Sequence, residues 1–317
     1  MKTYKIGYCG IAKDCFEIYI ISILHKYTDI NIEIIDDFYN EYCDMIVYTP
    51  LVPHEYLISN HISYYIHEIM KPSINYNIDK VKFLCISGEP HAFPNKDYNE
   101  INTDNNFLKI KRNDYSISHT TDSPTNCFIP YIYYELFNIQ NQKTIAERIN
   151  KSKDIFCSII SSTNSIHRQK YIDFVSYYKP VEIYGQISND TNRHNISEEM
   201  IQTIYESSKF NLAIENSISI EGESYITEKI AKAYRYGCIP IYFGSDYVYE
   251  IFNEKTFIDA KKYDEDELRE IIRNINKNDD LYNNIINQPI YKNPNFNYYL
   301  YFHNKLIDFM YNLLTKE

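Results

Sequence analysis

The chain has 317 residues, enough for one large domain or two ordinary domains with a substantial core. Its formal net charge of −11 argues against a nucleic-acid partner, because a phosphate backbone needs a basic face to bind. Any anionic ligand must therefore be held by a local group of basic residues. The seven cysteines are scattered and form no CxxC pair, and Cys9, Cys85 and Cys157 lie in apolar runs. Buried, reduced thiols in a cytoplasmic, soluble chain are therefore expected.

The first half alternates short apolar runs with amphipathic stretches. The opening MKTYKIGYCG has a strand pattern rather than that of a signal peptide, and no apolar run is long enough to predict a transmembrane segment. Strands are predicted at 4–10, 31–36, 44–50 and 81–87, with a helix at 14–27. Residues 95–126 are less regular, and the polar stretch NIQNQKTIAERIN at 138–150 predicts a helix that bridges two halves of the chain.

The second half repeats the alternation. We predict strands at 154–160, 181–185, 210–216 and 238–244, and helices at 167–178, 227–236, 264–288 and 297–315. Strands interleaved with helices predict parallel sheets covered by helices. The expected fold is α/β, with two Rossmann-like lobes, 1–145 and 146–317, that face each other across a cleft; the last helix packs back across the lobes. Ligands of such sheets bind beyond the carboxyl ends of the strands. The sequence has no GxGxxG motif, which disfavours NAD enzymes.

One polar stretch directly precedes an apolar helix and strand, in GESYITEKIAKAYRYGCIPIYFGS at 222–245. The predicted helix places Glu228 and Lys229 in its first turn and ends before Gly237. Free N–H groups and the positive end of the helix dipole suit an anion there. Glu228 also fits a purely stabilising role at a helix start. The charge of Lys229 opposes the dipole, and a phosphate between the lysine and the helix end would remove this conflict.

Residues 210–245 resemble the donor-binding motif of the α1,3/4-fucosyltransferases, glycosyltransferase family 10. The family pattern runs through Phe-x-Leu-x-Phe-Glu-Asn-Ser/Thr, Tyr-Val-Thr-Glu-Lys and Pro-Val/Ile-Tyr-Trp-Gly, and here reads FNLAIENS, YITEK and IPIYFG. The departures, Ile214 for Phe and Phe243 for Trp, keep an apolar side chain. FCSIISSTNSIHRQKYIDFVSYY at 156–178, KFLCISGEPHAF at 82–93 and FNEKTFID at 252–259 are also similar to the family. Taken alone, Arg168 fits a surface arginine at a helix start, and Glu89 a solvated turn residue.

The resemblance implies a GT-B fold, GDP-fucose as donor and inversion at the sugar carbon. Arg168 and Lys229 would hold the negative charge that develops on GDP as the sugar leaves. Glu228 would accept hydrogen bonds from ribose hydroxyls. Asn216 and Tyr225 would orient the fucose and the diphosphate, with Ser161 as a weaker candidate. Glu89, from the amino-terminal lobe that binds the acceptor, would be the general base, with Glu215 as its rival.

No essential metal or cofactor is expected, although an added divalent ion would help GDP to leave. Asp264-Glu-Asp266 fits an acidic helix start, and His91, His167 and His194 are not at ligand spacing. The expected acceptor is an oligosaccharide that contains N-acetylglucosamine, fucosylated through an α1,3 or α1,4 linkage. The alternatives are the same scaffold with another GDP-deoxysugar, and a GT-B-like glycan- or nucleotide-binding protein without turnover.

Overall fold

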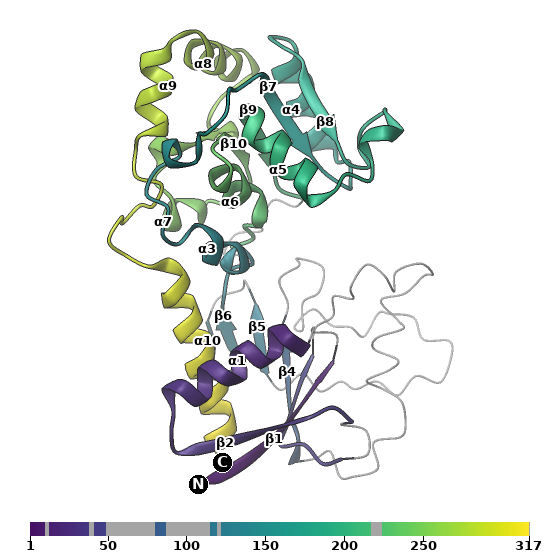
Figure 1. Ribbon diagram of the computed structural model, residues 1–317, viewed down its shortest axis with the longest axis vertical. Coiled ribbons are helices and arrows are strands. Elements are labelled where there is room, and N and C mark those ends of the chain that lie inside the picture. Colours follow the sequence, from purple (N-terminus) through teal and green to yellow (C-terminus); the bar gives the residue numbers. More distant parts are fainter. Residues whose placement is uncertain are drawn as a thin grey trace. The chain divides into compact units, whose positions relative to one another are not determined.

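The computed structural model describes residues 1–9, 13–37, 41–48, 80–86, 115–118, 122–216 and 224–316 (Figure 1). The chain divides into two compact units, one formed by Met1–Pro130 with Leu300–Glu317 and the other by Tyr131–Tyr299. This division by internal contacts falls at 130/131, whereas the sequence placed the lobe boundary at 145/146. It also groups most of the last helix with the amino-terminal unit.

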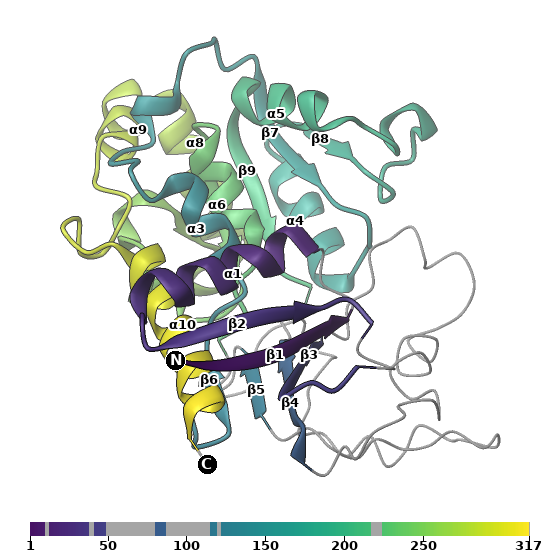
Figure 2. The same cartoon turned by 60° about the horizontal axis from the view of Figure 1, so that its bottom comes forward.

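The first unit contains a six-stranded sheet in the order β2-β1-β3-β4-β5-β6, in which every neighbouring pair is parallel. The strands are β1 (Lys2–Cys9), β2 (Ile30–Ile35), β3 (Met45–Tyr48), β4 (Lys82–Ile86), β5 (Tyr115–Ser118) and β6 (Asn126–Phe128). The helices are α1 (Lys13–Lys26) and, from Leu300 on, α10 (Tyr298–Thr315). Figure 2 shows α1 lying over β1 and β2. Stacked rings of Tyr27 and Tyr311, with centroids 3.6 Å apart, join the region after α1 to α10.

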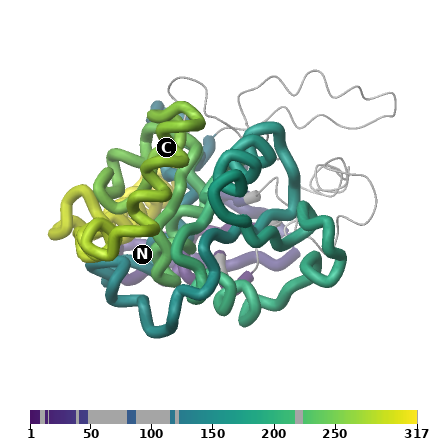
Figure 3. The backbone as a smooth tube through the Cα atoms, turned by 90° about the horizontal axis from the view of Figure 1, so that it is seen from above, coloured from purple at the N-terminus to yellow at the C-terminus, as the bar shows by residue number. Residues whose placement is uncertain are grey.

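The second unit contains a five-stranded parallel sheet in the order β11-β10-β9-β7-β8. Its strands are β7 (Ile155–Ile160), β8 (Val181–Tyr184), β9 (Ser208–Ile214), β10 (Ile239–Phe243) and β11 (Ile258–Asp259). Its α-helices are α3 (Tyr133–Ile139), α4 (Ile166–Ser176), α5 (Glu198–Ser207), α6 (Glu228–Arg235), α7 (Val248–Ile251), α8 (Glu265–Lys277) and α9 (Asp279–Ile286). Figure 3 follows this path from teal to yellow-green. The central strands β9 and β10 are almost wholly buried, as their continuous apolar runs predict.

The predicted helix at 138–150 is wrong. The α-helix α3 ends at Ile139, and only a short 3-10 helix, Ala146–Arg148, lies in the second part of the stretch. Tertiary contacts hold the residues between them: the buried amide of Gln142 donates to the carbonyl of Tyr234 at 2.8 Å, and Thr144 pairs with Pro289 as an isolated bridge. These partners lie far away in the sequence, so a local pattern does not reveal them.

Two other helices differ from the sequence analysis. The predicted helix at 264–288 is two helices, α8 and α9, because Asn278 breaks the first and caps the second by accepting from the backbone N–H of Leu281 at 3.1 Å. Helix α5 was not predicted, although Ser197 before two glutamates is a recognisable helix start.

The expected buried thiols are confirmed for the cysteines whose side chains the structure describes. Cys43, Cys85, Cys127, Cys157 and Cys238 are buried and take part in no disulfide. Burial raises the pKa of Cys127 and of Cys238 to about 12, so both stay protonated at neutral pH. In the part of the chain that the structure describes, no helix has both the length and the apolar character needed to cross a membrane.

Candidate functional site

The carboxyl end of the central strand β9 leads into Glu215 and Asn216, where a ligand of a parallel sheet would bind. Glu215 continues the pairing with β10, donating its backbone N–H to the carbonyl of Phe243 at 2.9 Å. Its side chain is 0 % exposed, and both carboxylate oxygens have partners. Oε1 accepts from the backbone N–H of Thr227 at 2.8 Å, and Oε2 accepts from the Thr227 hydroxyl at 2.6 Å.

Lys229 completes this group. Helix α6 begins at Glu228, after the N-cap residue Thr227, so Lys229 lies in the first turn as predicted. Its Nζ atom lies 3.2 Å from Oε2 of Glu215 and donates to the Thr227 hydroxyl at 2.9 Å. The Lys229 side chain is 15 % exposed. The buried carboxylate of Glu215 therefore already balances a lysine whose charge opposes the helix dipole, with no phosphate required.

The pKa of Lys229 reflects this setting. Burial on its own would lower the pKa of Lys229, but Glu215 and Glu228 raise it above its ordinary value, against a smaller opposing effect of Arg168. The carboxylate of Glu228 lies 3.6 Å from Nζ. The amine is therefore fully protonated at neutral pH and provides a permanent positive charge.

Arg168 lies in the first turn of α4 and is only 1 % exposed, so its interpretation as a surface arginine is wrong. Nη1 donates to the carbonyl of Thr163 and, at 2.9 Å, to its hydroxyl. Nη2 donates to the carbonyl of Ile214 at 3.2 Å and to the side-chain oxygen of Asn216. All four acceptors are neutral, so none cancels the guanidinium charge. Among the described residues, no acceptor lies within hydrogen-bonding distance of its buried Nε.

Nearby negative charges offset part of the effect that burial has on Arg168. Burial lowers the pKa of Arg168, while the negative charges of Glu215 and Glu228 and the hydroxyl of Tyr225 oppose this effect. An arginine remains charged at neutral pH despite such a shift. The site therefore holds two buried or half-buried cations at the carboxyl end of β9.

The other predicted donor-binding residues lie in the same region. Burial would raise the pKa of Glu228, but Lys229 and the residue's own backbone N–H bring it below its ordinary value, so Glu228 is ionised. Ser161 follows β7 and donates to the Thr163 carbonyl at 3.0 Å, the same carbonyl that accepts from Arg168. Tyr225 is 1 % exposed, just before α6. Glu89, the predicted base, lies outside the described residues.

Three contributors to this site were not predicted from the sequence. Thr163 holds the guanidinium of Arg168, and Thr227 links Glu215 to Lys229. Gly244, which follows β10, makes room for the carboxylate: a Cβ there would lie 2.6 Å from Cγ of Glu215 and 2.3 Å from the hydroxyl of Tyr242. Glycine at the end of a buried strand, in a chain with only seven glycines, was the available signal.

The acidic run at 264–266 starts a helix, as predicted. Asp264 caps α8 by accepting from the backbone N–H of Glu267 at 2.9 Å, and Glu267 returns the contact in a capping box. Arg269 forms ion pairs with Glu265 and Asp266. Within the described ranges, no group of three or more His, Cys, Asp and Glu residues is arranged to hold a metal ion.

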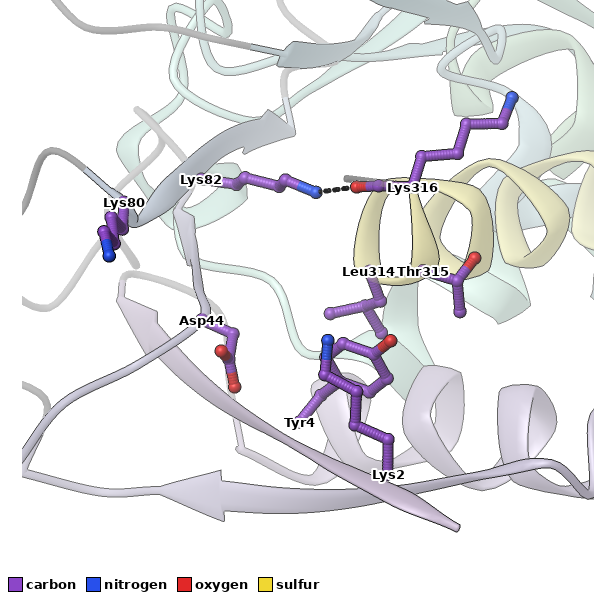
Figure 4. Close-up of a pocket in the computed structure, with 8 residues that line it drawn as sticks. All are labelled: Lys2, Tyr4, Asp44, Lys80, Lys82, Leu314, Thr315 and Lys316. Carbon is purple, nitrogen blue, oxygen red and sulfur yellow. Dashed lines mark hydrogen bonds between the residues drawn. The ribbon is translucent and has the colours of Figure 1, made fainter.

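A separate pocket of about 130 Å³ lies in the first unit (Figure 4). It is lined by Lys2, Lys80, Lys82 and Asp44 together with the end of α10. The amine of Lys82 donates to the carbonyls of Leu313 and Lys316, each at 2.5 Å, and so caps that helix. The pocket lies at the amino ends of β1 and β4, whereas ligands of parallel sheets bind at the carboxyl ends.

Comparison with known proteins finds a family match within the second unit. Residues 149–287 match the model of the C-terminal domain of glycosyltransferase family 10 (fucosyltransferase). A protein of Acanthamoeba polyphaga mimivirus, provisionally named a fucosyltransferase, is 30% identical over 242 residues, which cover 73% of this chain and 39% of that protein. The α-(1,3)-fucosyltransferase FucT of Helicobacter pylori is 35% identical over 114 residues, or 35% of this chain and 23% of that enzyme. The chain thus spans less than half the length of these curated relatives.

Solved structures agree on the fold. A crystal structure of an α1,3-fucosyltransferase with GDP-fucose aligns over 100% of this chain and 91% of its own, with a TM-score of 0.64 and 18% identity. A DNA-modifying β-glucosyltransferase aligns over 99% of this chain and 96% of its own, with a TM-score of 0.54 and 12% identity. The predicted α/β fold of GT-B type is confirmed. The sequence matches add that residues 149–287 are similar to the C-terminal domain of glycosyltransferase family 10, the fucosyltransferase family.

Proposed function

We propose that the protein is an inverting glycosyltransferase that transfers L-fucose from GDP-fucose to a hydroxyl of a glycan acceptor. The observation that carries this proposal is the pair of cations, Arg168 and Lys229, at the carboxyl end of β9 inside the family 10 domain. A sugar bound to a nucleoside diphosphate leaves negative charge on the diphosphate as its bond breaks, and fixed cations stabilise that charge. GDP-fucose is the donor named for the fucosyltransferase crystal structure of the same fold.

Each donor-site residue has a role that its surroundings support. The hydrogen-bond acceptors of Arg168 are neutral, so its positive charge remains to attract the diphosphate. Lys229 supplies the second positive charge. The ionised carboxylate of Glu228 accepts hydrogen bonds from the ribose hydroxyls. Asn216 and Tyr225 orient the fucose and the diphosphate, and Ser161 contributes from the loop after β7.

The general base of this mechanism is Glu89, which takes the proton of the acceptor hydroxyl as its oxygen attacks the anomeric carbon. Glu215 remains the alternative base. Its contacts favour a different role, because both of its oxygens already accept hydrogen bonds and its side chain is fully buried. A base must reach the acceptor hydroxyl, and Glu215 would have to give up these partners to do so.

The reaction needs no bound metal on this proposal, since the two cations supply the charge neutralisation; a divalent ion would stimulate product release. The acceptor is an N-acetylglucosamine-containing oligosaccharide, modified through an α1,3 or α1,4 linkage. The runner-up is the same site with another GDP-deoxysugar, because most of the residues above are assigned to the nucleotide and the phosphates rather than to the sugar's distinguishing groups.

Thermal unfolding with added nucleotides tests the donor assignment. GDP should raise Tm, while UDP and NAD at the same concentration should not, because a ligand that binds only the folded state stabilises it. A rise with UDP and none with GDP would contradict the assignment. Transfer from a panel of GDP-sugars to a glycan array then identifies the sugar, the acceptor and the linkage. Glu89→Gln should reduce transfer by about 10²–10⁴-fold and leave the GDP-induced rise in Tm unchanged.

A further inference from the structure

We infer that Glu215 is a positioning residue that acts through Lys229, holding the amine at the amino end of α6 where it meets the donor diphosphate. The inference rests on the proposed function for the diphosphate, but the contact between Glu215 and Lys229 is a property of the ligand-free protein. It gives Glu215 a role distinct from that of a general base.

One short segment organises both cations. Ile214 and Asn216 contribute the oxygens that hold Nη2 of Arg168, and Glu215, between them, contributes the carboxylate that holds Lys229. Ile214, the last residue of β9, contributes its backbone carbonyl, whereas Glu215 and Asn216, directly after the strand, contribute side chains. Three consecutive residues at the end of the central strand therefore contact both positive charges.

Glu215 holds Lys229 by two routes. The direct route is the ion pair at 3.2 Å. The second passes through Thr227, whose backbone N–H and hydroxyl both donate to Glu215 and whose hydroxyl accepts from Nζ of Lys229 at 2.9 Å. Thr227 is the N-cap of α6 but makes no side-chain cap hydrogen bond to its own helix, because its hydroxyl is committed to this network. Glu215 thus fixes the start of the helix as well as the amine.

The charges that face Lys229 determine how the loss of the Glu215 carboxylate would change the pKa of Lys229. They are Glu215 after β9, Glu228 on α6 and Arg168 on α4. Without the Glu215 carboxylate, burial and Arg168 both favour the neutral amine, and Glu228 at 3.6 Å is the remaining opposing charge. A neutral Lys229 would bind a diphosphate poorly, and binding would then require that the amine take up a proton.

The variant Glu215→Gln separates charge from shape. The amide oxygen still accepts from the Thr227 backbone, and the amide nitrogen can donate to the Thr227 hydroxyl, but the negative charge is lost and Nζ of Lys229 loses Oε2 as an acceptor. Glu206→Gln is the matched control: Glu206 is also a buried carboxylate, 8 % exposed, paired with Lys151 at 2.5 Å, and it lies on α5 away from the site.

The first measurement needs no ligand. Competitive acetylation of the intact protein across pH, read by mass spectrometry, gives the apparent pKa of Lys229, with exposed Lys277 as an internal reference. Glu215→Gln should lower the pKa of Lys229 by about 1–3 units relative to the wild type, the size expected for loss of an adjacent opposite charge. Glu206→Gln should leave it unchanged. Equal values in the wild type and Glu215→Gln overturn the inference, whatever nucleotide the protein binds.

The second measurement is calorimetric binding of GDP in buffers of different ionisation enthalpy. The wild type should bind without proton uptake between pH 7 and 9, whereas Glu215→Gln should take up protons and lose affinity as pH rises. Pyrophosphate replaces GDP if GDP does not bind, so failure of the donor assignment leaves this arm intact. If Glu215→Gln loses affinity equally at every pH, with no proton uptake, Glu215 does not act through the charge of Lys229 and the inference fails.

A double-mutant cycle covers the case in which Glu215→Gln folds poorly. Replacing both partners of a buried pair is far less damaging than removing one, so Glu215→Gln/Lys229→Met should fold as well as Lys229→Met. If Glu215 acts through Lys229, adding Glu215→Gln to Lys229→Met should change the dissociation constant for GDP or pyrophosphate less than threefold. A further loss of tenfold or more would show that Glu215 acts independently and would overturn the inference.

Discussion

The side chain of Glu215 fills the space beside Gly244 that any side chain at position 244 would need. A Cβ added to Gly244 would lie 2.6 Å from Cγ of Glu215, a distance that real Cβ atoms essentially never show. Gly244 follows β10, and Glu215 follows the neighbouring strand β9, so the two residues meet where the strands end. The glycine therefore sets the position of the carboxylate that holds Lys229.

Gly244→Ala should displace Glu215 or the ring of Tyr242, whose hydroxyl lies 2.3 Å from the added carbon. Overpacking of this kind costs about 1–3 kcal/mol, so the denaturant midpoint should fall with an unchanged slope. GDP affinity should fall further than stability alone explains, because Lys229 loses its anchor. Adding Tyr242→Phe should restore little, since Cζ of the ring remains 2.6 Å away. Full recovery in that double variant would mean that the hydroxyl, and not Glu215, is the obstacle.

Most strands of the two sheets could be predicted from the sequence, and so could the start of α6, where Glu228 and Lys229 lie. The continuous apolar runs of β9 and β10 and the glycine after α6 are local signals, and α6 ends just before Gly237, which has a φ of +79°. The partners of the charged residues are not local. The contact from Glu215 to Lys229 spans 14 positions, and that from Arg168 to Asn216 spans 48, so no local pattern predicts the burial of these side chains. The same limit explains the failed helix at 138–150, where Gln142 pairs with Tyr234, 92 positions away.

Arg168→Lys should be a severe change although it keeps the charge. A lysine amine cannot reproduce the fork that serves the Thr163 and Ile214 carbonyls and Asn216 together, so buried acceptors lose their donors. The free energy of unfolding should fall by about 1–3 kcal/mol, measured in denaturant, and GDP binding should weaken as well. The control is Arg193→Lys, at a half-exposed pair with Glu182, where the loss should stay below about 1 kcal/mol. Equal losses in both variants would contradict a special role for Arg168.

Glu228→Gln tests the contact with the ribose. If the carboxylate accepts from ribose hydroxyls, the wild type should bind GDP more tightly than 2′-deoxy-GDP or 3′-deoxy-GDP, and the variant should lose at least one of these preferences. Hydrogen bonds to charged groups contribute about 1.5–3 kcal/mol, or roughly tenfold or more in affinity. Glu198→Gln is the matched control, because Glu198 is likewise the first residue of its helix, α5. If Glu228→Gln keeps the same preference for GDP over both deoxy nucleotides, Glu228 does not contact the ribose.

The acid stability of the protein should also depend on Glu228. Its pKa is lower in the folded protein than its ordinary value, so the folded state favours the ionised form. Such a group contributes stability at pH values above its unfolded pKa, about 4.3, and that contribution is lost as pH falls through the folded pKa. The stability difference between the wild type and Glu228→Gln, measured in urea, should therefore shrink between about pH 5 and pH 3. A difference that is constant over this range would contradict the shift.

Asp264 and Asp266 should matter for folding and not for a metal. Asp264 caps α8 and Asp266 pairs with Arg269, so Asp264→Ala should lower the free energy of unfolding by about 1 kcal/mol through loss of the cap. Transfer by Asp264→Ala/Asp266→Asn should match the wild type in EDTA, and added Mn²⁺ should stimulate both proteins by the same factor. If the double variant loses only the stimulation, the run binds the stimulating ion. If it loses transfer in EDTA as well, without unfolding, the acidic run takes part in the reaction and the assignment of charge neutralisation to Arg168 and Lys229 is incomplete.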